Sequence, residues 1–203
     1  MVERIKIIGV ANSPYTRKML SILRYKHIPY EVHWGDVATH LSQLGIEPPR
    51  PILLPTVLLK KEENIYEAAT DTTPIIRRLE NDYPARSIIP EDPALSFINY
   101  LLEDFGDEWV TKYMFHYRWH FAEDADNAGT ILPLSHAVNL PEDIHSDFKS
   151  IVAKRQIDRL WVVGSSDKTA ALIDSSYKRF LKLMENHLSV CPFLFGNKPS
   201  SAD

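Results

Sequence analysis

The stretch Leu54-Pro55-Thr56-Val57, together with Asp71-Thr72-Thr73-Pro74-Ile75-Ile76 further along the chain, decides the fold. Proline lacks an N–H, so Pro55 suits the first residue of a strand or a sheet edge rather than a strand centre. X-Pro bonds are the common place for a cis peptide, and such bonds usually shape a turn. If the Leu54–Pro55 bond is cis, the N–H and C=O of Leu54 should stay exposed, pointing out of the sheet.

The second stretch is typical of a helix start. Asp71, Thr72 and Thr73 are all capping residue types, and Pro74 fits the first helical turn. A helix start offers free N–H groups and a positive dipole end, which together suit a carboxylate. The two stretches therefore predict a binding turn and an anion-binding helix start.

The 203-residue composition is that of an ordinary soluble globular protein, with 44% apolar and 25% charged residues. The net charge of −4, without a long basic run, argues against nucleic acid or an anionic membrane as a partner. Cys191 is the only cysteine, which excludes an intrachain disulfide and fits a reducing compartment. Glu3, Arg4 and Lys6 within the first apolar run argue against a signal peptide. We expect a cytoplasmic protein.

The first eighty-odd residues have the element order βαβ and then ββα, which is the thioredoxin-like order. Short apolar or alternating runs predict strands at 5–10, 30–34, 55–59 and 64–66, the last two joined by a charged turn at 60–63. Capping residues and prolines predict helices that begin near residues 14 and 73, with a short helix within 35–50. This prediction of an α/β domain does not depend on any motif.

The chain resembles glutathione transferases in four stretches that occur in the family's order. These are Ser13-Pro14-Tyr15-Thr16, Leu54-Pro55-Thr56-Val57, Asp71 to Ile76 with Leu79-Glu80, and Phe193-Leu194-Phe195-Gly196 with Pro199 to Asp203. The resemblance covers essentially the whole chain. It implies a thioredoxin-like glutathione-binding domain in residues 1–83, a linker at 84–93 and an all-α bundle in residues 94–203.

In this superfamily the residue at the start of the first helix activates the glutathione sulfur. Redox members have Cys-Pro-Tyr-Cys there, and this chain has a serine and a threonine instead, so dithiol exchange at this site is excluded. A hydroxyl donor and the helix start would lower a thiol pKa of about 8.5 by roughly one unit. Ser13 is the first catalytic candidate, with Tyr15 and Asn12 next. The alternative is that Ser13 only caps the helix.

The resemblance also implies which groups hold the tripeptide. The backbone of Leu54, held open by Pro55, would pair antiparallel with the cysteinyl part of glutathione. Asp71 would meet the γ-glutamyl ammonium, and Thr72 with the helix start its carboxylate. The family usually has serine where Thr72 stands, and threonine keeps the hydroxyl. Ordinary helix capping by these residues is the alternative.

A long amphipathic helix is expected from Ala94 onward. One stripe at helical spacing predicts its core-facing side: Ile98, Leu101, Leu102, Phe105, Trp109 and His116. Asp104 and Asp107 lie opposite, with Glu103 nearby, which predicts the solvent side.

Further helices are expected at 142–163 and 169–188. Gly129, Pro133 and Pro141 predict a loop over residues 127–141 between the long helix and the first of these. Cys191 is expected to be a buried apolar filler.

In glutathione transferases the long helix supplies the pocket for the apolar co-substrate. The resemblance therefore makes Tyr113, His116 and Tyr117 substrate-binding candidates, although an aromatic stripe is more often core than pocket. His116 and His120 share a helix face, but Tyr117 stands where an H-E-x-x-H site needs a carboxylate. We expect no metal site.

The stretch from Phe193 to Asp203 resembles the family's signature at the start of a central helix. Ser200 as N-cap and Asp203 three residues on form a pair like a capping box. Because no helix follows this signature, we expect the protein to continue for roughly 50–70 residues, as a domain of ordinary size requires.

The resemblance implies a glutathione transferase-like enzyme that activates the glutathione thiol for attack on a small apolar electrophile. It also implies a homodimer formed through the N-terminal domain. The alternative is a catalytically silent protein of the same fold that binds a ligand or a partner, since a fold alone does not decide function. Asp71-Thr72 beside Pro55 favours the enzyme.

Overall fold

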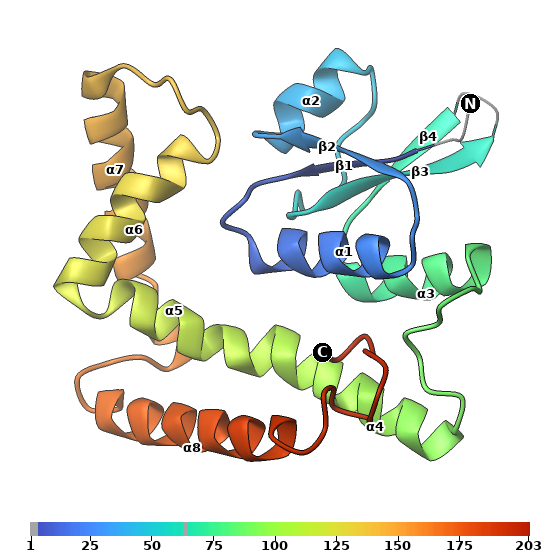
Figure 1. The fold of residues 1–203 in the computed structure, drawn as a ribbon. Helices are drawn as coiled ribbons and strands as arrows, with labels where there is room; N and C mark the ends of the chain where they lie inside the picture. Colours follow the sequence, from blue (N-terminus) through green and yellow to red (C-terminus); the bar gives the residue numbers. More distant parts are fainter. Residues whose placement is uncertain (1–3, 63–64) are drawn as a thin grey trace. The chain divides into compact units, whose positions relative to one another are not determined.

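A computed structural model describes residues 4–62 and 65–203 (Figure 1). The chain divides into an N-terminal unit, residues 1–87 with 135–138, and a helical unit, residues 88–134 with 139–203. The charged turn predicted at 60–63 is wrong for residues 60–62, which continue the strand β3 (Thr56–Glu62), and Glu63 and Asn64 lie outside the described residues.

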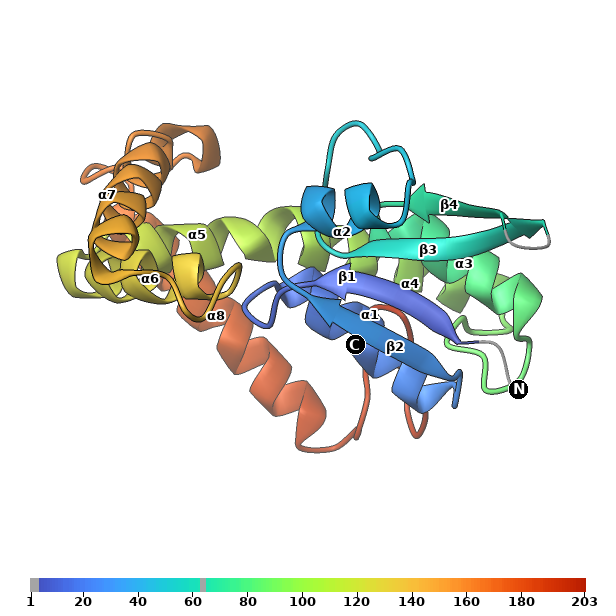
Figure 2. The same cartoon turned by 90° about the horizontal axis from the view of Figure 1, so that it is seen from above.

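The N-terminal unit contains a four-stranded sheet and three helices in thioredoxin-like order. Its elements are β1 (Ile5–Gly9), α1 (Pro14–Tyr25), β2 (Tyr30–Trp34), α2 (Val37–Gln43), β3 (Thr56–Glu62), β4 (Ile65–Ala69) and α3 (Thr72–Asp82). The strand order is β2-β1-β3-β4, as Figure 2 shows from above. β1 and β2 are parallel, and the other neighbours are antiparallel. The predicted α/β fold is confirmed.

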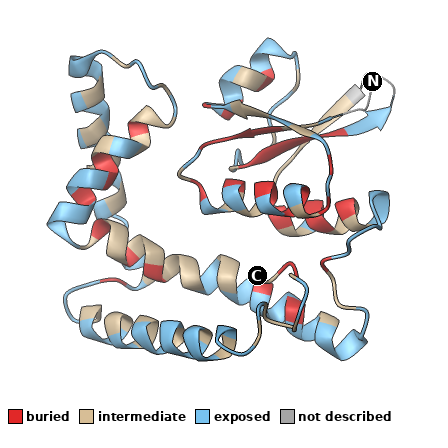
Figure 3. Cartoon of the chain, viewed as in Figure 1, coloured by how far each residue is buried: buried red, intermediate tan, exposed pale blue. Residues whose placement is uncertain are grey.

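The sheet separates two apolar layers. Ile8 and Leu58 face α2, which packs on them through Val37 and Leu41. Ile7 and Val57 are register partners and, because side chains alternate along a strand, face the opposite side. On that side α1 and α3 cover the sheet (Figures 1 and 3) with a row of buried side chains: Met19, Leu20, Leu23, Ile75, Ile76 and Leu79. The sheet is therefore held between helices on both faces.

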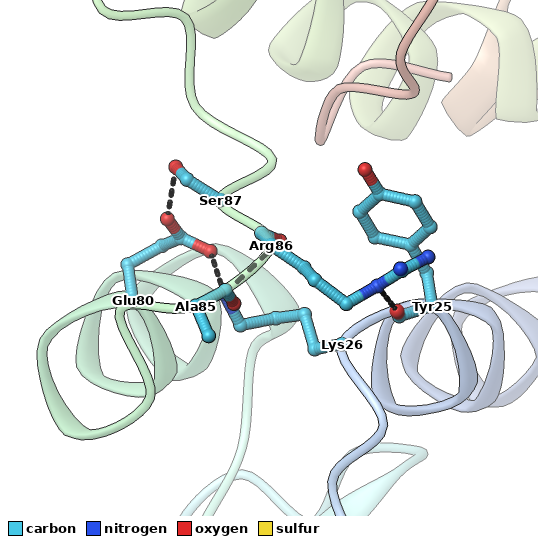
Figure 4. A network of polar contacts seen from close by, with 6 residues as sticks. All are labelled: Tyr25, Lys26, Glu80, Ala85, Arg86 and Ser87. Carbon is cyan, nitrogen blue, oxygen red and sulfur yellow. Dashed lines mark hydrogen bonds and ion pairs between the residues drawn. The ribbon is translucent and has the colours of Figure 1, made fainter.

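A buried lysine at the end of α1 ties this helix to α3 and to the segment after it (Figure 4). The Nζ atom of Lys26 lies 2.6 Å from Oε1 of Glu80 and donates to the carbonyls of Ala85 and Arg86 at 3.2 and 3.4 Å. The guanidinium of Arg86 lies over the ring of Tyr25, 4.4 Å from its centroid, and donates to the Tyr25 carbonyl. Three segments of the unit are thus joined at one cation.

The helical unit begins with one nearly continuous helical rod. This rod consists of α4 (Pro93–Asp104), the π-helical turn η1 (Phe105–Val110) and α5 (Thr111–Trp119). The unit continues with α6 (Ala122–Leu134), α7 (Glu142–Ile157), the short 3-10 helix η2 (Leu160–Val163) and α8 (Ala170–Leu188). Trp119, Ala125 and Ala128 form a buried cluster with Val152 and Ala153 of α7. Among the described residues, no helix combines the length and apolar character needed to cross a membrane.

The loop predicted over 127–141 is wrong in its first half, because α6 continues to Leu134. A side chain at Gly129 would lie 3.4 Å from the Cβ of Ala153, so glycine here allows α6 to pack closely on α7. Pro133 lies in the last turn of α6, where a missing N–H removes only one backbone hydrogen bond near the helix end. Tertiary packing therefore outweighs the two helix-breaking residues.

The predicted burial of the long helix is also wrong. The apolar stripe residues Ile98, Leu101, Leu102, Phe105 and Trp109 are exposed in the described chain, and only His116 of that stripe is buried.

The buried side chains of α4 are instead Asn99 and Glu103. The Asn99 amide donates to Oγ of Ser201 at 2.8 Å, and that hydroxyl donates to Glu103 at 2.6 Å. The predicted Ser200–Asp203 pair is confirmed, because the Ser200 N–H donates to Asp203 Oδ2 at 2.8 Å. Hydrogen bonding to residues 199–203, which helical periodicity cannot reveal, thus selects the buried face. Cys191 is half-buried rather than buried.

Candidate functional site

The sheet register brings the three predicted site segments of the N-terminal unit to one end of the sheet. Ile8 pairs with Thr56, and Val57 pairs with Ala69. The residues after β1, before β3 and after β4 therefore leave the sheet at the same end. These are the segments that contain Ser13, Leu54-Pro55 and Asp71-Thr72.

Ser13 is the N-cap of α1. Its extended backbone (φ −81°, ψ 120°) lets Oγ accept a hydrogen bond from the Thr16 N–H at 3.2 Å, and Pro14 occupies the first turn. The Ser13 side chain is almost fully buried. The hydrogen of its hydroxyl has no acceptor among the described residues, so it can still be donated to a ligand. Capping and donation are compatible on this hydroxyl.

The Leu54–Pro55 bond is cis. The hydroxyl of Thr56 donates to the carbonyl of Leu53 at 2.9 Å and fixes the turn before β3. Within the described part of the chain, neither the N–H nor the C=O of Leu54 has a backbone hydrogen-bond partner. Leu54 is thus half-buried, precedes the buried residues Pro55 and Thr56, and has unpaired main-chain groups.

Asp71 is the N-cap of α3, and its Oδ1 accepts the Thr73 N–H at 3.1 Å. Its φ of 71° lies in a region that few residues other than glycine adopt. Thr72, the first helical residue, is buried, and its hydroxyl has no partner within residues 4–62 and 65–203. Because the Thr73 N–H already bonds to Asp71 and Pro74 has no N–H, the first turn of α3 leaves the N–H of Thr72 for a ligand.

Two helix starts therefore lie at this end of the sheet, because α1 follows β1 and α3 follows β4 directly. Each start presents the positive end of a helix dipole, and the start of α3 also offers the N–H of Thr72, which is unpaired within the described residues. Such an end stabilises a thiolate or a carboxylate, while the exposed carboxylate of Asp71 suits an ammonium group. Within the described chain, no group of three or more His, Cys, Asp or Glu residues is arranged to hold a metal ion.

The three aromatic candidates lie together on α5, in the helical unit. The hydroxyl of Tyr113 is hydrogen-bonded to Ser176 at 2.7 Å, and Nδ1 of His116 to Ser165 at 2.7 Å. Tyr117 donates to Asp174 at 2.7 Å. Burial, followed by this bond, raises the pKa of Tyr117 to about 12.

His116 is fully buried, its ring stacks on His120 at 4.6 Å, and burial lowers its pKa. The hydroxyls of Tyr113 and Tyr117 are thus held by α8, and Nδ1 of His116 by the turn before it, whereas Nε2 of His116 is buried without a hydrogen-bond partner in the described chain. Their role toward a co-substrate stays a prediction.

One contact beside Ser13 has no strong sequence signal. Thr16 is fully buried, and its Oγ1 lacks a hydrogen-bond partner in the described chain. It packs directly against Gly9 at the end of β1. A glycine at the end of a strand that precedes a capped helix is a weak hint of such close packing.

Comparisons with known proteins match this architecture. Residues 7–87 match the family model "Glutathione S-transferase, N-terminal domain", a range that contains all three site segments. A search of curated proteins by sequence finds no match.

Solved structures match over nearly the whole chain. FzlA from C. crescentus is 14% identical with a TM-score of 0.60, covering 98% of this chain and 74% of that one. A glutathione S-transferase from Rhodospirillum rubrum F11 is 16% identical with a TM-score of 0.57, covering 98% and 72%. Beta-etherase LigF from Sphingobium sp. strain SYK-6 is 16% identical with a TM-score of 0.58, covering 98% and 79%. At these identities the likeness shows the fold.

Proposed function

We propose that the protein binds glutathione and activates its thiol for attack on a small apolar electrophile, because residues 7–87 match the family model of the glutathione S-transferase N-terminal domain and the chain has a glutathione transferase-like fold. One observation carries the proposal. The sheet register gathers the unpaired Leu54 main chain, the start of α3 and the start of α1 at one end.

The tripeptide is held mainly by main-chain groups. The N–H and C=O of Leu54 pair with the cysteinyl residue of glutathione, as in an added antiparallel strand. The start of α3 and the hydroxyl of Thr72 receive the γ-glutamyl carboxylate. The exposed carboxylate of Asp71 meets the ammonium of the same residue. The cysteinyl main chain and both charged groups of the γ-glutamyl residue therefore each have a complementary partner.

Activation of the thiol falls to Ser13. Its hydroxyl hydrogen, unpaired within the described residues, is donated to the sulfur and stabilises the thiolate together with the start of α1. Tyr15, half-buried two residues on, is the next candidate. The thiolate then attacks the electrophile, for which Tyr113, His116 and Tyr117 are the proposed pocket residues.

A second candidate function is a silent glutathione transferase-fold protein that binds a ligand or a partner. It is favoured by the fact that Ser13 Oγ and Asp71 Oδ1 already accept hydrogen bonds as helix caps. Both residues would then be explained without a substrate. In either case we propose a cytoplasmic protein, since a chain with one cysteine fits a reducing compartment. We also propose a homodimer, which the resemblance to glutathione transferases implies.

Calorimetric titration with glutathione, followed by ultraviolet titration of the bound thiol, separates the two functions. We expect binding, a thiol pKa lowered by roughly one unit, and loss of most of that shift in Ser13→Ala. Asp92→Ala is the matched control, because it removes the N-cap of α4, which accepts the Leu95 N–H at 2.9 Å. No binding at millimolar glutathione would instead support the silent protein.

A further inference from the structure

The first turn of α1 lies unusually close to the end of β1. A Cβ placed on Gly9 would be 2.6 Å from Cγ2 of Thr16 and 2.8 Å from its Oγ1. Real Cβ contacts are not that short, so even an alanine at residue 9 requires the Thr16 side chain to rotate or its helix turn to move. The absence of a side chain at Gly9 therefore allows this turn to pack closely against the sheet.

Thr16 in turn holds Ser13. The Thr16 N–H donates to Oγ of Ser13 at 3.2 Å, which fixes the orientation of the Ser13 hydroxyl. The Oγ1 of Thr16 itself is buried without a partner in the described chain, an arrangement that normally costs stability. The shape of this β-branched side chain, rather than the hydrogen bonding of its hydroxyl, accounts for its place against Gly9.

We propose that Gly9 and Thr16 are positioning residues for Ser13: their close contact fixes the capping bond that aims the Ser13 hydroxyl at the thiol. The role toward the thiol rests on the proposed function. The placement of Ser13 does not, so the two can be tested separately.

The test adds a methyl group at residue 9, removes side-chain atoms at residue 16, or does both. Gly9→Ala should displace the turn and weaken the capping bond, so that exchange of the Thr16 amide hydrogen becomes about tenfold faster. Thr16→Ala should loosen the turn from the other side. In Gly9→Ala/Thr16→Ala the new methyl occupies the space that Cγ2 and Oγ1 vacate. Amide exchange in the double variant should therefore lie closer to wild type than in Gly9→Ala.

The same variants are compared by the pKa of the bound glutathione thiol. Gly9→Ala should raise that pKa toward the value of the free thiol, and the double variant should restore the lowered value. Thr16→Val, which keeps the shape and removes the unpaired hydroxyl, should leave both readouts unchanged. The control is Gly106→Ala, since a Cβ there has no neighbour within 4 Å.

Wild-type Thr16 amide protection in Gly9→Ala, or no recovery in the double variant, would overturn the positioning role. If Gly9→Ala does not fold, Thr16→Ala against Thr16→Val decides the same question, because only the first removes the contact. If wild-type protein does not bind glutathione, the proposed function fails, and amide exchange still decides whether Gly9 and Thr16 place Ser13.

Discussion

At the level of single residues, Asp71 combines a rare backbone conformation with two demands on one carboxylate. Its φ of 71° with a ψ of 120° lies outside the left-handed helical region that Asp and Asn tolerate, so this backbone conformation is unfavourable for any residue other than glycine. One carboxylate oxygen caps α3 through the Thr73 N–H. The proposed ligand ammonium requires the charge of the same group. Capping and charge can be separated by a substitution that keeps the shape.

Asp71→Asn should weaken glutathione binding about tenfold, since a charge-assisted hydrogen bond becomes a neutral one. The free energy of unfolding should change by less than about 0.5 kcal/mol, because Asn and Asp are comparable N-caps. Calorimetry and denaturant unfolding measure the two effects. Asp92→Asn, the same change at the cap of α4, should leave affinity as it is. Equal affinity of Asp71→Asn and wild type would remove Asp71 from the site.

At the level of elements, Lys26 joins α1, α3 and the segment after α3 through one fully buried ammonium group. Its partner Glu80 also accepts a hydrogen bond from Ser87 at 2.5 Å. Removing one member of a buried pair leaves the other charge and its neighbours uncompensated, which costs more than the pair contributes in total.

Lys26→Met should therefore lower the free energy of unfolding by about 3 kcal/mol, measured by denaturant titration. The matched control is Lys154→Met, since Lys154 forms an exposed i,i+4 pair with Asp158 at 2.7 Å. That change should cost less than about 0.5 kcal/mol. A similar small loss for both variants would show that the Lys26 network is as weak as a surface pair.

The packing of α5 on α8 should make stability depend on pH through His116. Burial and the neighbouring His120 lower its pKa, whereas Asp174 acts in the opposite direction. Protonation therefore favours the unfolded chain. The stabilising effect is complete above the unfolded pKa of roughly 6.5 and is lost as pH falls toward the lower folded pKa.

The comparison is made by denaturant unfolding between pH 7 and 5. The slope of stability against pH should be shallower in His116→Asn than in wild type, by at most about 1.4 kcal/mol per pH unit. His27→Asn provides the control, because His27 is exposed and its positive φ of 56° suits Asn. An unchanged slope in His116→Asn would place the acid sensitivity in another group.

At the level of the whole molecule, the N-terminal unit could be predicted from sequence because its signals are local. The strand predicted at 30–34 matches β2, and Ser13 caps α1 as its residue type predicts. For α3 the sequence predicts a cap among three residues, of which Asp71 is the N-cap. The sequence predicts open main-chain groups at Leu54 only if the bond before Pro55 is cis, and this bond is cis. The close contact of Gly9 with Thr16 depends on how a helix lies against a strand, which no local pattern reveals.

The helical unit was less predictable because contacts distant in sequence override periodicity. Asn99 and Glu103 are polar, yet residues near the end of the described chain bury them, while the apolar stripe of α4 is exposed. The π-helical turn η1 also breaks the 100° spacing on which the stripe was counted. Gly129 and Pro133 signalled a loop and lie in a helix instead.

In the proposed function Leu54 binds glutathione through its backbone N–H and C=O, and every amino acid except proline carries the same two groups. Replacement of the Leu54 side chain alters local packing but keeps the backbone N–H and C=O. An alanine substitution at this position should therefore change the affinity for glutathione very little. The information for binding is stored in the path of the chain. Proteins with dissimilar sequences but the same backbone path at this turn can therefore offer the same binding groups with different residues.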